Sequence, residues 1–282
     1  MKERNGPVEP FRIQHLSSRI VRITGPMHEN IYLVKGDERA ALIDSGSGFG
    51  SLRRVADGLT ALPLTVLLTH GHMDHAMGAG EFGEVRMNPQ DIPVFCDHAR
   101  PDYRRAFLRV TCREKADTLP MVPAAEPGQF RPLADGDSFD LGGLHLDVFG
   151  CPGHTPGSVV VLLRELRILF MGDACSNFTF LAGKECLPVE AYRENLLALK
   201  ERLAGRFDTV LDAHGTGELP ADIMDGVLEV CDDVLAGRTD DVPYAFGGCR
   251  GVLAKARLPH SQLRADGKTG NIFYRKERNG TA

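Results

Sequence analysis

The segment THGHMDH, from Thr69 to His75, constrains the fold more than any other part of this 282-residue sequence. Residues two apart in an extended segment point the same way, so His70 and His72 can reach one ion. Asp74 and His75 come as the chain turns towards the next segment, and they can face a second ion. This pattern arises by chance in roughly one chain in a thousand of such composition. The segment therefore predicts a fold in which a strand end carries a metal-binding site.

Three further polar residues also lie at or just beyond the end of an apolar strand. His154 follows LDVFG, Asp173 follows LFMG and His214 follows TVLDA, as His70 follows VLLT. Strand ends on one edge of a sheet can converge, which assembles a site on rigid elements. Either histidine alone is more often a hydrogen-bonded structural residue, but the cluster favours a metal role for both. Imidazole and carboxylate ligands suit divalent zinc, with iron or manganese as chemical alternatives.

Hydrophobic patterning predicts an alternation of strands and helices along the chain. Short apolar segments between turn residues predict strands over 20–25, 30–36, 40–46, 64–70, 85–88, 92–97, 144–150, 158–164, 167–173, 209–215 and 271–276. Apolar positions at helical spacing predict helices over 49–60, 100–110, 189–205 and 222–237, and a helix start within 76–82.

The stretch from about 98 to 132 differs from its surroundings because a segment of helical character, 100–110, is followed by a segment rich in proline and alanine with little periodicity, 118–132. We interpret it as a helical and irregular insertion that packs over or beside the site. Internal repeats and low-complexity linkers are absent from the sequence. We therefore predict a single domain over 1–282, with a C-terminal helical extension and a closing strand over about 218–282.

Charge and composition limit the classes of partner. The net charge is −5 and the basic residues are scattered, so the sequence does not predict nucleic-acid binding. It also has no apolar run long enough to span a bilayer and no secretion signal within MKERNGPVEP. Seven cysteines without a Cys-x-x-Cys pair suit a reducing compartment. We expect a cytoplasmic protein with a small-molecule substrate and no membrane partner, either as a monomer or as a homodimer.

The order of these motifs resembles that of the metallo-β-lactamase superfamily. The family pattern is met by HGHMDH, CPGHTPGS, MGDA and DAHG in turn, and LIDSG (42–46) resembles the family's early Asp-Gly turn. The resemblance spans roughly residues 13–217 and implies an α/β fold, a four-layer αββα sandwich with the metals at one edge of two packed sheets. It also implies two divalent ions: one held by His70, His72 and His154, the other by Asp74, His75 and His214, with Asp173 bridging them.

The resemblance implies a metallo-hydrolase that uses a hydroxide between the two ions. A zinc-bound water has a pKa of about 7, so hydroxide exists at neutral pH without a strong separate base. Asp74 and Asp173 are the predicted catalytic residues. Asp74 is also expected to carry a proton during turnover. We predict cleavage of an ester-like bond in a thioester, lactone or related acyl compound, although the Gly-Cys-Gly stretch of glyoxalase II and the lactonase tyrosine are absent.

Two other classes share such a site. A phosphodiesterase or nuclease could use the same two ions, but basic patches are missing. An iron-dependent oxidoreductase is the second alternative, either a flavodiiron-type oxygen reductase or a sulfur dioxygenase. The flavodiiron motif typically has glutamate where this chain has His72, which counts against it. Metal analysis and oxygen consumption discriminate these alternatives from a hydrolase.

Several residues near the motifs permit two interpretations. Asp44 is either a turn residue that bonds to backbone amides or a partner that orients a metal-bound imidazole. Cys175 could be a thiolate ligand, but we interpret it and Cys151 as small packing residues. Three other histidines, His98, His145 and His260, are interpreted as structural or solvent residues, with His260 within reach of the pocket mouth.

The residues after Asp173 and those of the insertion are expected to form the pocket wall. Phe178 and Phe180 could offer an apolar surface to the substrate, although aromatic residues at alternate positions are more often core. Tyr103 and Phe107 of the insertion belong to the same wall. We expect the neighbouring Arg104 and Arg105 to form a solvated helix face rather than an anion clamp.

Overall fold

The first of two large sheets is built by the N-terminal half of the chain. The computed structural model describes residues 10–111 and 118–276. The antiparallel strands β1 to β4 are continued by β5, β6 and β7, each parallel to its predecessor. This sheet contains β1 (Arg12–His15), β2 (Ile20–Thr24), β3 (Asn30–Lys35), β4 (Ala40–Ile43), β5 (Leu64–Leu67), β6 (Val85–Met87) and β7 (Phe130–Pro132).

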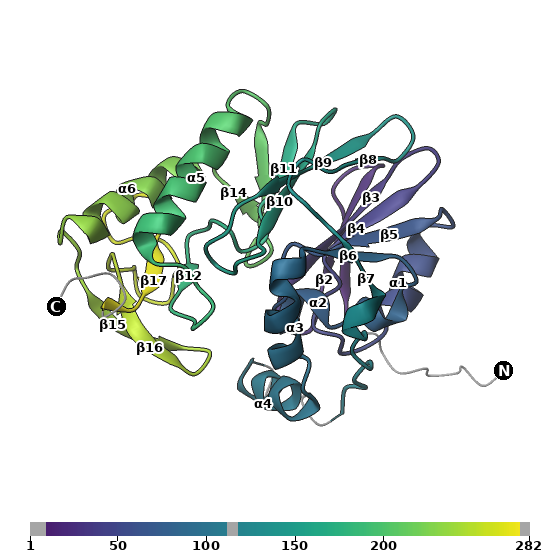
Figure 1. Cartoon of the computed structure of the whole chain (residues 1–282), viewed down its shortest axis with the longest axis horizontal. Coiled ribbons are helices and arrows are strands. Elements are labelled where there is room, and N and C mark those ends of the chain that lie inside the picture. Colours follow the sequence, from purple (N-terminus) through teal and green to yellow (C-terminus); the bar gives the residue numbers. More distant parts are fainter. Residues whose placement is uncertain (1–9, 112–117, 277–282) are drawn as a thin grey trace.

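The second sheet comes from the C-terminal half and packs against the first (Figure 1). Its spatial order is β14, β13, β11, β10, β9 and β8, with β11 and β13 parallel and the other neighbours antiparallel. The strands are β8 (Ser138–Asp140), β9 (His145–Gly150), β10 (Val159–Leu163), β11 (Ile168–Phe170), β13 (Thr209–Leu211) and β14 (Glu218–Leu219).

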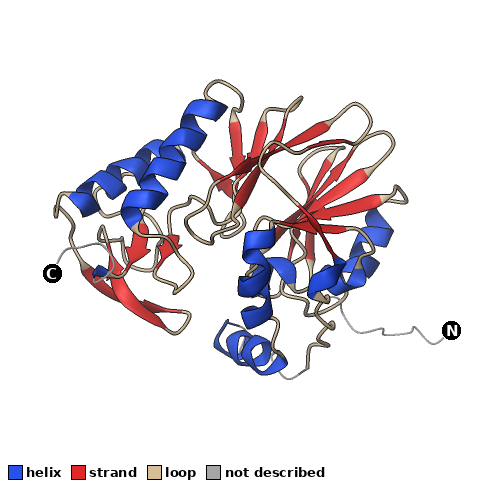
Figure 2. Cartoon of the chain, in the orientation of Figure 1, coloured by secondary structure: helices blue, strands red, loops and turns tan. Residues whose placement is uncertain are grey.

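Helices cover the outer faces of both sheets (Figure 2). Those in the first half are α1 (Leu52–Leu59), α2 (Met73–Ala76), α3 (Ile92–His98) and α4 (Pro101–Thr111), with the short 3-10 helices η1 (Ala79–Glu81), η2 (Pro89–Asp91) and η3 (Pro127–Gln129). The second half contributes α5 (Val189–Leu203) and α6 (Ile223–Leu235).

Three buried clusters give the layer order. Val34, Leu67, Val161 and Phe170 belong to the cluster between the two sheets. A second cluster joins the first sheet to α1, α2 and α3, and a third joins the second sheet to α5 and α6. The central strands β3, β4 and β10 are buried along almost their whole length, so both faces of each sheet are covered, and the helices supply the two outer layers. The predicted four-layer αββα sandwich is confirmed.

The prediction of a strand over 92–97 is wrong, because this segment forms the helix α3. Ile92, Phe95 and Ala99 pack into one buried cluster, and their spacing of three and four residues is that of a helix face. A short apolar run is ambiguous by periodicity alone. The preceding Asn88 accepts a hydrogen bond from Gln90 N as a helix cap and could have given the signal.

A third sheet was not predicted except for its closing strand. It has the order β12, β17, β16 and β15, and it lies beside α5 and α6 (Figure 1). Its strands are β12 (Thr179–Leu181), β15 (Val242–Phe246), β16 (Cys249–Leu253) and β17 (Ile272–Tyr274). The hairpin of β15 and β16 contains three glycines, Gly247, Gly248 and Gly251. Residues 277–282 of the predicted extension lie outside the described residues.

The predicted insertion over 98–132 contains α4, η3 and the edge strand β7, while residues 112–117 lie outside the described residues. The prediction of a solvated arginine face on α4 is wrong. Arg104 is buried and donates hydrogen bonds to the carbonyl oxygens of Ser47, Gly48 and Val122. Its guanidinium supplies hydrogen-bond donors to carbonyl oxygens in loops, which no helix or strand would otherwise pair.

None of the helices over the described ranges has the length and apolar character needed to cross a bilayer.

Candidate metal centre

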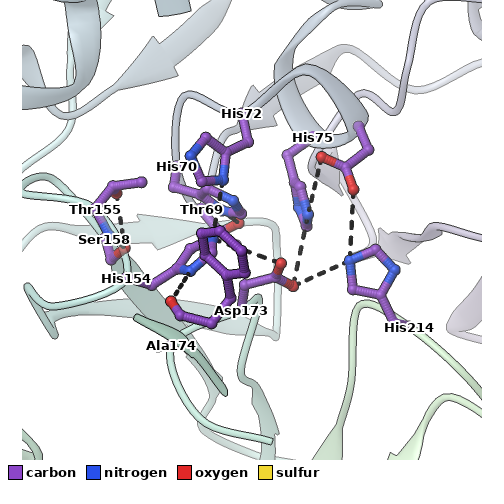
Figure 3. A network of polar contacts seen from close by, with 12 residues as sticks. Thr69, His70, His72, His75, His154, Thr155, Ser158, Asp173, Ala174 and His214 are labelled. Carbon is purple, nitrogen blue, oxygen red and sulfur yellow. Dashed lines mark hydrogen bonds and ion pairs between the residues drawn. The ribbon is translucent and has the colours of Figure 1, made fainter. Parts of the chain in front are cut away.

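The structure brings all seven predicted ligands to one end of the two packed sheets, five of them in loops and Asp74 and His75 in the short helix α2. Figure 3 labels six of them. The segment from His70 to His75 follows β5 of the first sheet. His154, Asp173 and His214 follow β9, β11 and β13 of the second sheet. The two sheets pack face to face, so segments that follow their strands at the same end lie close together. The ligand side chains therefore converge from both sheets.

The donor atoms of these residues form three groups in which all atoms lie within 4.8 Å of one another. Such a separation is what ligands around a shared ion require, because Zn–N and Zn–O contacts are about 2.0–2.2 Å. The groups overlap through His70 and His75, so they describe one continuous site. They are His70, His72 and His154; His70, His75 and Asp173; and Asp74, His75 and His214.

Asp173 lies between the two outer groups, and its two oxygens face different sides. Oδ2 lies 3.6 Å from His154 Nε2, whereas Oδ1 lies 3.2 Å from His214 Nε2 and 3.6 Å from His75 Nε2. Burial raises the pKa of this carboxyl, but the positive charges of His214 and His75 outweigh burial and hold it well below its usual range. An ionised carboxylate in this position can contact two ions at once.

The contact between His72 and His154 tests whether the site suits a cation. His154 Nδ1 lies 2.8 Å from the carbonyl oxygen of Phe180, and His72 Nε2 lies 3.3 Å from Glu185 Oε1. Both partners only accept hydrogen bonds, so these two nitrogens carry the protons. The lone pairs of His72 Nδ1 and His154 Nε2 then meet at 2.9 Å. This repulsive contact becomes favourable with a cation between the two nitrogens.

Burial also leaves donor atoms of the cluster without protein partners. His70 Nε2 and His75 Nε2 are buried and make no hydrogen bond within the described residues. Burial and the neighbouring imidazoles hold the pKa of His70 well below its usual value, and burial with His72 lowers the pKa of His154 to about 4. Neutral imidazoles with free lone pairs are the form that binds metal ions, so His70 and His154 fit the predicted ligands. Burial lowers the pKa of His75 and of His214, but the charge of Asp173 and other carboxylates outweighs burial, raising the first well above its usual value and the second to about 9. A metal ion bound at these two histidines would displace their protons.

Asp44 holds two parts of the cluster in place. Its Oδ1 accepts a hydrogen bond from Thr69 N at 2.7 Å, and its Oδ2 lies 2.8 Å from His75 Nδ1. The contacts agree with both interpretations of Asp44, since it binds a backbone amide and orients an imidazole. Its φ of 68° lies in the left-handed region, which a non-glycine residue keeps only where its surroundings enforce it.

Glu185 orients His72 but was not predicted, because it lies in a loop without a recognisable motif. Burial raises its pKa, yet the hydrogen bond and charge of His72 lower the pKa to about 2, so the side chain is ionised. We expect Glu185→Ala to weaken metal binding roughly 10–100-fold, as loss of such an orienting partner does in other metal sites. Competition against a chromophoric chelator measures this change.

Glu165→Ala is the matched control for this prediction. Glu165 Oε1 lies 2.8 Å from Nδ1 of His145 at the surface, which confirms His145 as a structural histidine. The control removes the same kind of pair without touching the metal centre. Equal metal affinity of both variants would contradict an orienting role for Glu185.

Asp91 joins two of the ligand loops and was also missed. Its carboxylate accepts hydrogen bonds from Gly71 N at 2.7 Å, Thr155 Oγ1 at 2.7 Å and Gly157 N at 2.6 Å. Gly71 lies between His70 and His72, and Thr155 follows His154. A Cβ at Gly157 would lie 2.7 Å from Asp91 Oδ1, so glycine permits this approach. One buried carboxylate thereby sets the separation of both loops.

Three other residues from the sequence analysis have distinct positions. His98 is not a peripheral histidine: it stacks on His72 with ring centroids 4.6 Å apart and accepts a hydrogen bond from Met73 N. Cys175 is buried, and burial raises the pKa of its thiol well above the usual value, which agrees with a packing role. His260 is exposed and does not line the pocket.

The metal centre lies in a pocket of about 730 Å³ between two aromatic walls. One wall continues from His98 to Tyr103 and Phe107 of α4, with centroid distances of 4.8 and 6.2 Å. The other wall includes Phe178 and Phe180, which are partly buried and line the pocket. A pocket of this size with aromatic walls has room for a ligand with a sizeable apolar part.

Comparison with known proteins agrees with this geometry. The family model described as the metallo-beta-lactamase superfamily matches residues 24–204. The chain belongs to this superfamily. A relative from Gallus gallus, "Acyl-coenzyme A thioesterase MBLAC2", is 35% identical over 205 residues, which cover 66% of this chain and 72% of the relative. "Hydroxyacylglutathione hydrolase GloC" from Haemophilus influenzae is 26% identical over 72% of this chain and 91% of its own.

Solved metallo-β-lactamase structures share the fold. The metallo-beta-lactamase from Pontibacter korlensis superposes with a TM-score of 0.58 at 19% identity, covering 79% of this chain and 99% of its own. Membership of the superfamily, together with relatives named as thioesterase and hydroxyacylglutathione hydrolase, confirms the prediction of a metallo-hydrolase. His214 lies beyond the matched range, yet the structure brings it to within 3.2 Å of Asp173.

Proposed function

We propose that this chain is a dinuclear zinc hydrolase that cleaves acyl thioesters of small molecules. The observation that carries this proposal is the overlapping set of His and Asp donors inside an aromatic pocket of about 730 Å³. Two relatives whose names state a reaction, the acyl-coenzyme A thioesterase and the hydroxyacylglutathione hydrolase, support a thioester over a lactone.

In this proposal His70, His72 and His154 would hold one ion, Asp74, His75 and His214 would hold the other, and both ions would share Asp173. Nitrogen and carboxylate donors without a thiolate suit zinc. Two such ions supply Lewis acidity and an activated water for attack on the thioester carbon. Asp74 lines the pocket, with its Oδ2 3.6 Å from His214 Nε2, so its carboxylate is placed to accept a proton during turnover.

Metal removal tests the proposal directly. We expect about two zinc ions per chain by mass spectrometry, and we expect dialysis against a chelator to abolish hydrolysis of octanoyl thioesters. Addition of zinc should restore activity, measured as thiol release with a disulfide reagent. The proposed reaction depends on the ions that these residues would hold, so the chelated protein should not catalyse it.

A substrate panel decides between the proposed reaction and its rivals. It contains an octanoyl thioester, a lactone, a phosphodiester and a β-lactam, each assayed with the zinc-loaded protein. Preference for the thioester supports the proposal. Preference for the phosphodiester, or bound iron together with oxygen consumption, would overturn it.

A further inference from the structure

The aromatic wall formed by the third sheet carries a feature that the metal centre does not explain. Phe178 lies 5.6 Å from Tyr244 and 5.4 Å from Phe246, and Phe180 lies 6.2 Å from Phe246, measured between ring centroids. Tyr244 and Phe246 belong to β15, beyond the residues that the family model matches. This part of the pocket therefore lies outside the region that defines the superfamily match.

The wall begins at the metal centre itself. Phe180 accepts the hydrogen bond of His154 Nδ1 with its carbonyl oxygen, and its ring lies 5.8 Å from the His154 ring. From Phe180 the ring contacts continue through Phe246 to Phe178 and Tyr244. All four aromatic residues line the same pocket as His154. A substrate that reaches the ions can also touch this wall.

Arg257 lies on the far part of the wall. Its guanidinium carbon is 4.7 Å from the ring centroid of Tyr244 and 5.5 Å from that of Phe178. Such stacking occupies the face of the guanidinium and leaves its edge donors available, and attraction to the ring holds the group in place. The side chain is only partly exposed and lines the pocket.

The charges around Arg257 differ from those around Lys184 and Arg100, two other cations of the pocket. Lys184 pairs with Asp97, and Arg100 lies 3.7 Å from Asp102. For Arg257, by contrast, none of the ion pairs found over 10–111 and 118–276 includes its guanidinium. A partly desolvated guanidinium with available donors is a binding site for a carboxylate or phosphate.

We propose that Arg257 binds an anionic group of the thioester substrate and selects anionic thioesters over neutral ones. The proposal rests on the proposed thioester hydrolysis for its kinetic readout. The anion is a carboxylate or a phosphate, and the ring wall between Arg257 and His154 takes the intervening apolar part. Arg257 acts as a specificity residue, and the ions act on the same bond in every substrate.

Four substrates separate the sources of the anion. Octanoyl-coenzyme A carries phosphates, octanoyl-glutathione carries carboxylates, glutaryl-N-acetylcysteamine carries a carboxylate on its acyl half, and octanoyl-N-acetylcysteamine is neutral. Arg257→Met should raise KM about 10-fold for at least one anionic thioester, with kcat changed less than about twofold. KM for the neutral thioester should change less than about twofold. Arg257→Lys should recover part of the loss, because it keeps the charge without the planar fork.

The matched control is Arg53→Met, which removes another stacked arginine. Arg53 lies over Phe82 at 5.9 Å but does not line the pocket, so KM should stay unchanged for every substrate. An equal rise of KM for anionic and neutral thioesters in Arg257→Met would show that Arg257 only supports the wall, and it would overturn the proposal. Unchanged KM for all four thioesters would overturn it as well.

Binding of uncleavable analogues separates this proposal from the proposed function. The thioethers S-octyl-coenzyme A, S-octyl-glutathione and S-octyl-N-acetylcysteamine, together with the carboxypropyl thioether of N-acetylcysteamine, keep the charges but lack the carbonyl. Calorimetry should show about 10-fold weaker binding of at least one anionic thioether to Arg257→Met, with the neutral one unchanged. If wild-type protein cleaves none of the thioesters, the proposed function fails, and this pattern still supports the anion site. Equal affinities for wild type and variant would overturn the anion site alone.

Discussion

Replacing Asp173 with asparagine is expected to reduce hydrolysis about 10³-fold or more, because both proposed ions lose the charge that they share. The two carboxylate oxygens face opposite donor groups, at 3.6 Å from His154 and 3.2 Å from His214. An amide has one oxygen and no charge, so it can serve only one side of the site. Mass spectrometry should show metal content falling from about two ions to one or fewer per chain.

The matched control for this prediction is Asp208→Asn. Asp208 is an exposed aspartate that pairs with Arg167 at 2.6 Å, and its loss should leave both metal content and turnover unchanged. Circular dichroism checks that Asp173→Asn is folded. A folded Asp173→Asn protein that keeps two ions and full activity would contradict the bridging role.

The approximate position of the metal centre could be predicted from the sequence because its ligands follow strands with strong apolar patterns. Val66, Leu67, Leu169 and Val210 are fully or nearly fully buried, as continuous apolar runs predict for central strands. Once these strands pair within two packed sheets, the segments that follow them must meet at one end of the sheets. The separation of ligands along the chain then matters little, since the sheets bring them together.

The orienting partners could not be predicted in the same way. Glu185 lies 113 residues from His72 in sequence, and Asp91 lies 64 residues from Thr155. His154 is oriented by the backbone carbonyl of Phe180, for which side-chain identity carries no signal. Such contacts depend on how loops pack, whereas apolar periodicity describes only which face of an element is buried.

The third sheet escaped prediction for a related reason. The segment from 242 to 253 alternates apolar and polar residues poorly, and its turn contains Gly247 and Gly248 at positive φ. Tyr244 of this segment makes ring contacts with Phe178 and Phe273, which come from other parts of the chain. β-Strand formation depends on such cross-strand packing more than on intrinsic preference, so a sequence window does not contain the signal.

Asp91→Ala is expected to destabilise the protein by roughly 3–5 kcal/mol, because three hydrogen-bond donors to a buried carboxylate lose their acceptor. Asp91 is fully buried, and these donors come from the loops of His70 to His72 and of His154. The melting temperature should fall on the order of 10 °C, measured by calorimetry. Metal affinity of the folded variant should also fall roughly 10–100-fold, since the loops that carry three ligands lose their shared anchor.

A control variant and the metal measurement together separate anchoring of the ligand loops from simple core support. Asp57→Ala removes an exposed helix aspartate paired with Arg53, and it should change the free energy of unfolding by less than about 0.5 kcal/mol. Asp91→Asn keeps one acceptor oxygen, so its loss of stability should be smaller while its weakened metal binding persists. If Asp91→Ala lowers the melting temperature but binds zinc as tightly as wild type, Asp91 supports the core without setting the ligand loops. Weakened metal binding in a folded variant instead means that the site depends on a carboxylate that touches neither ion.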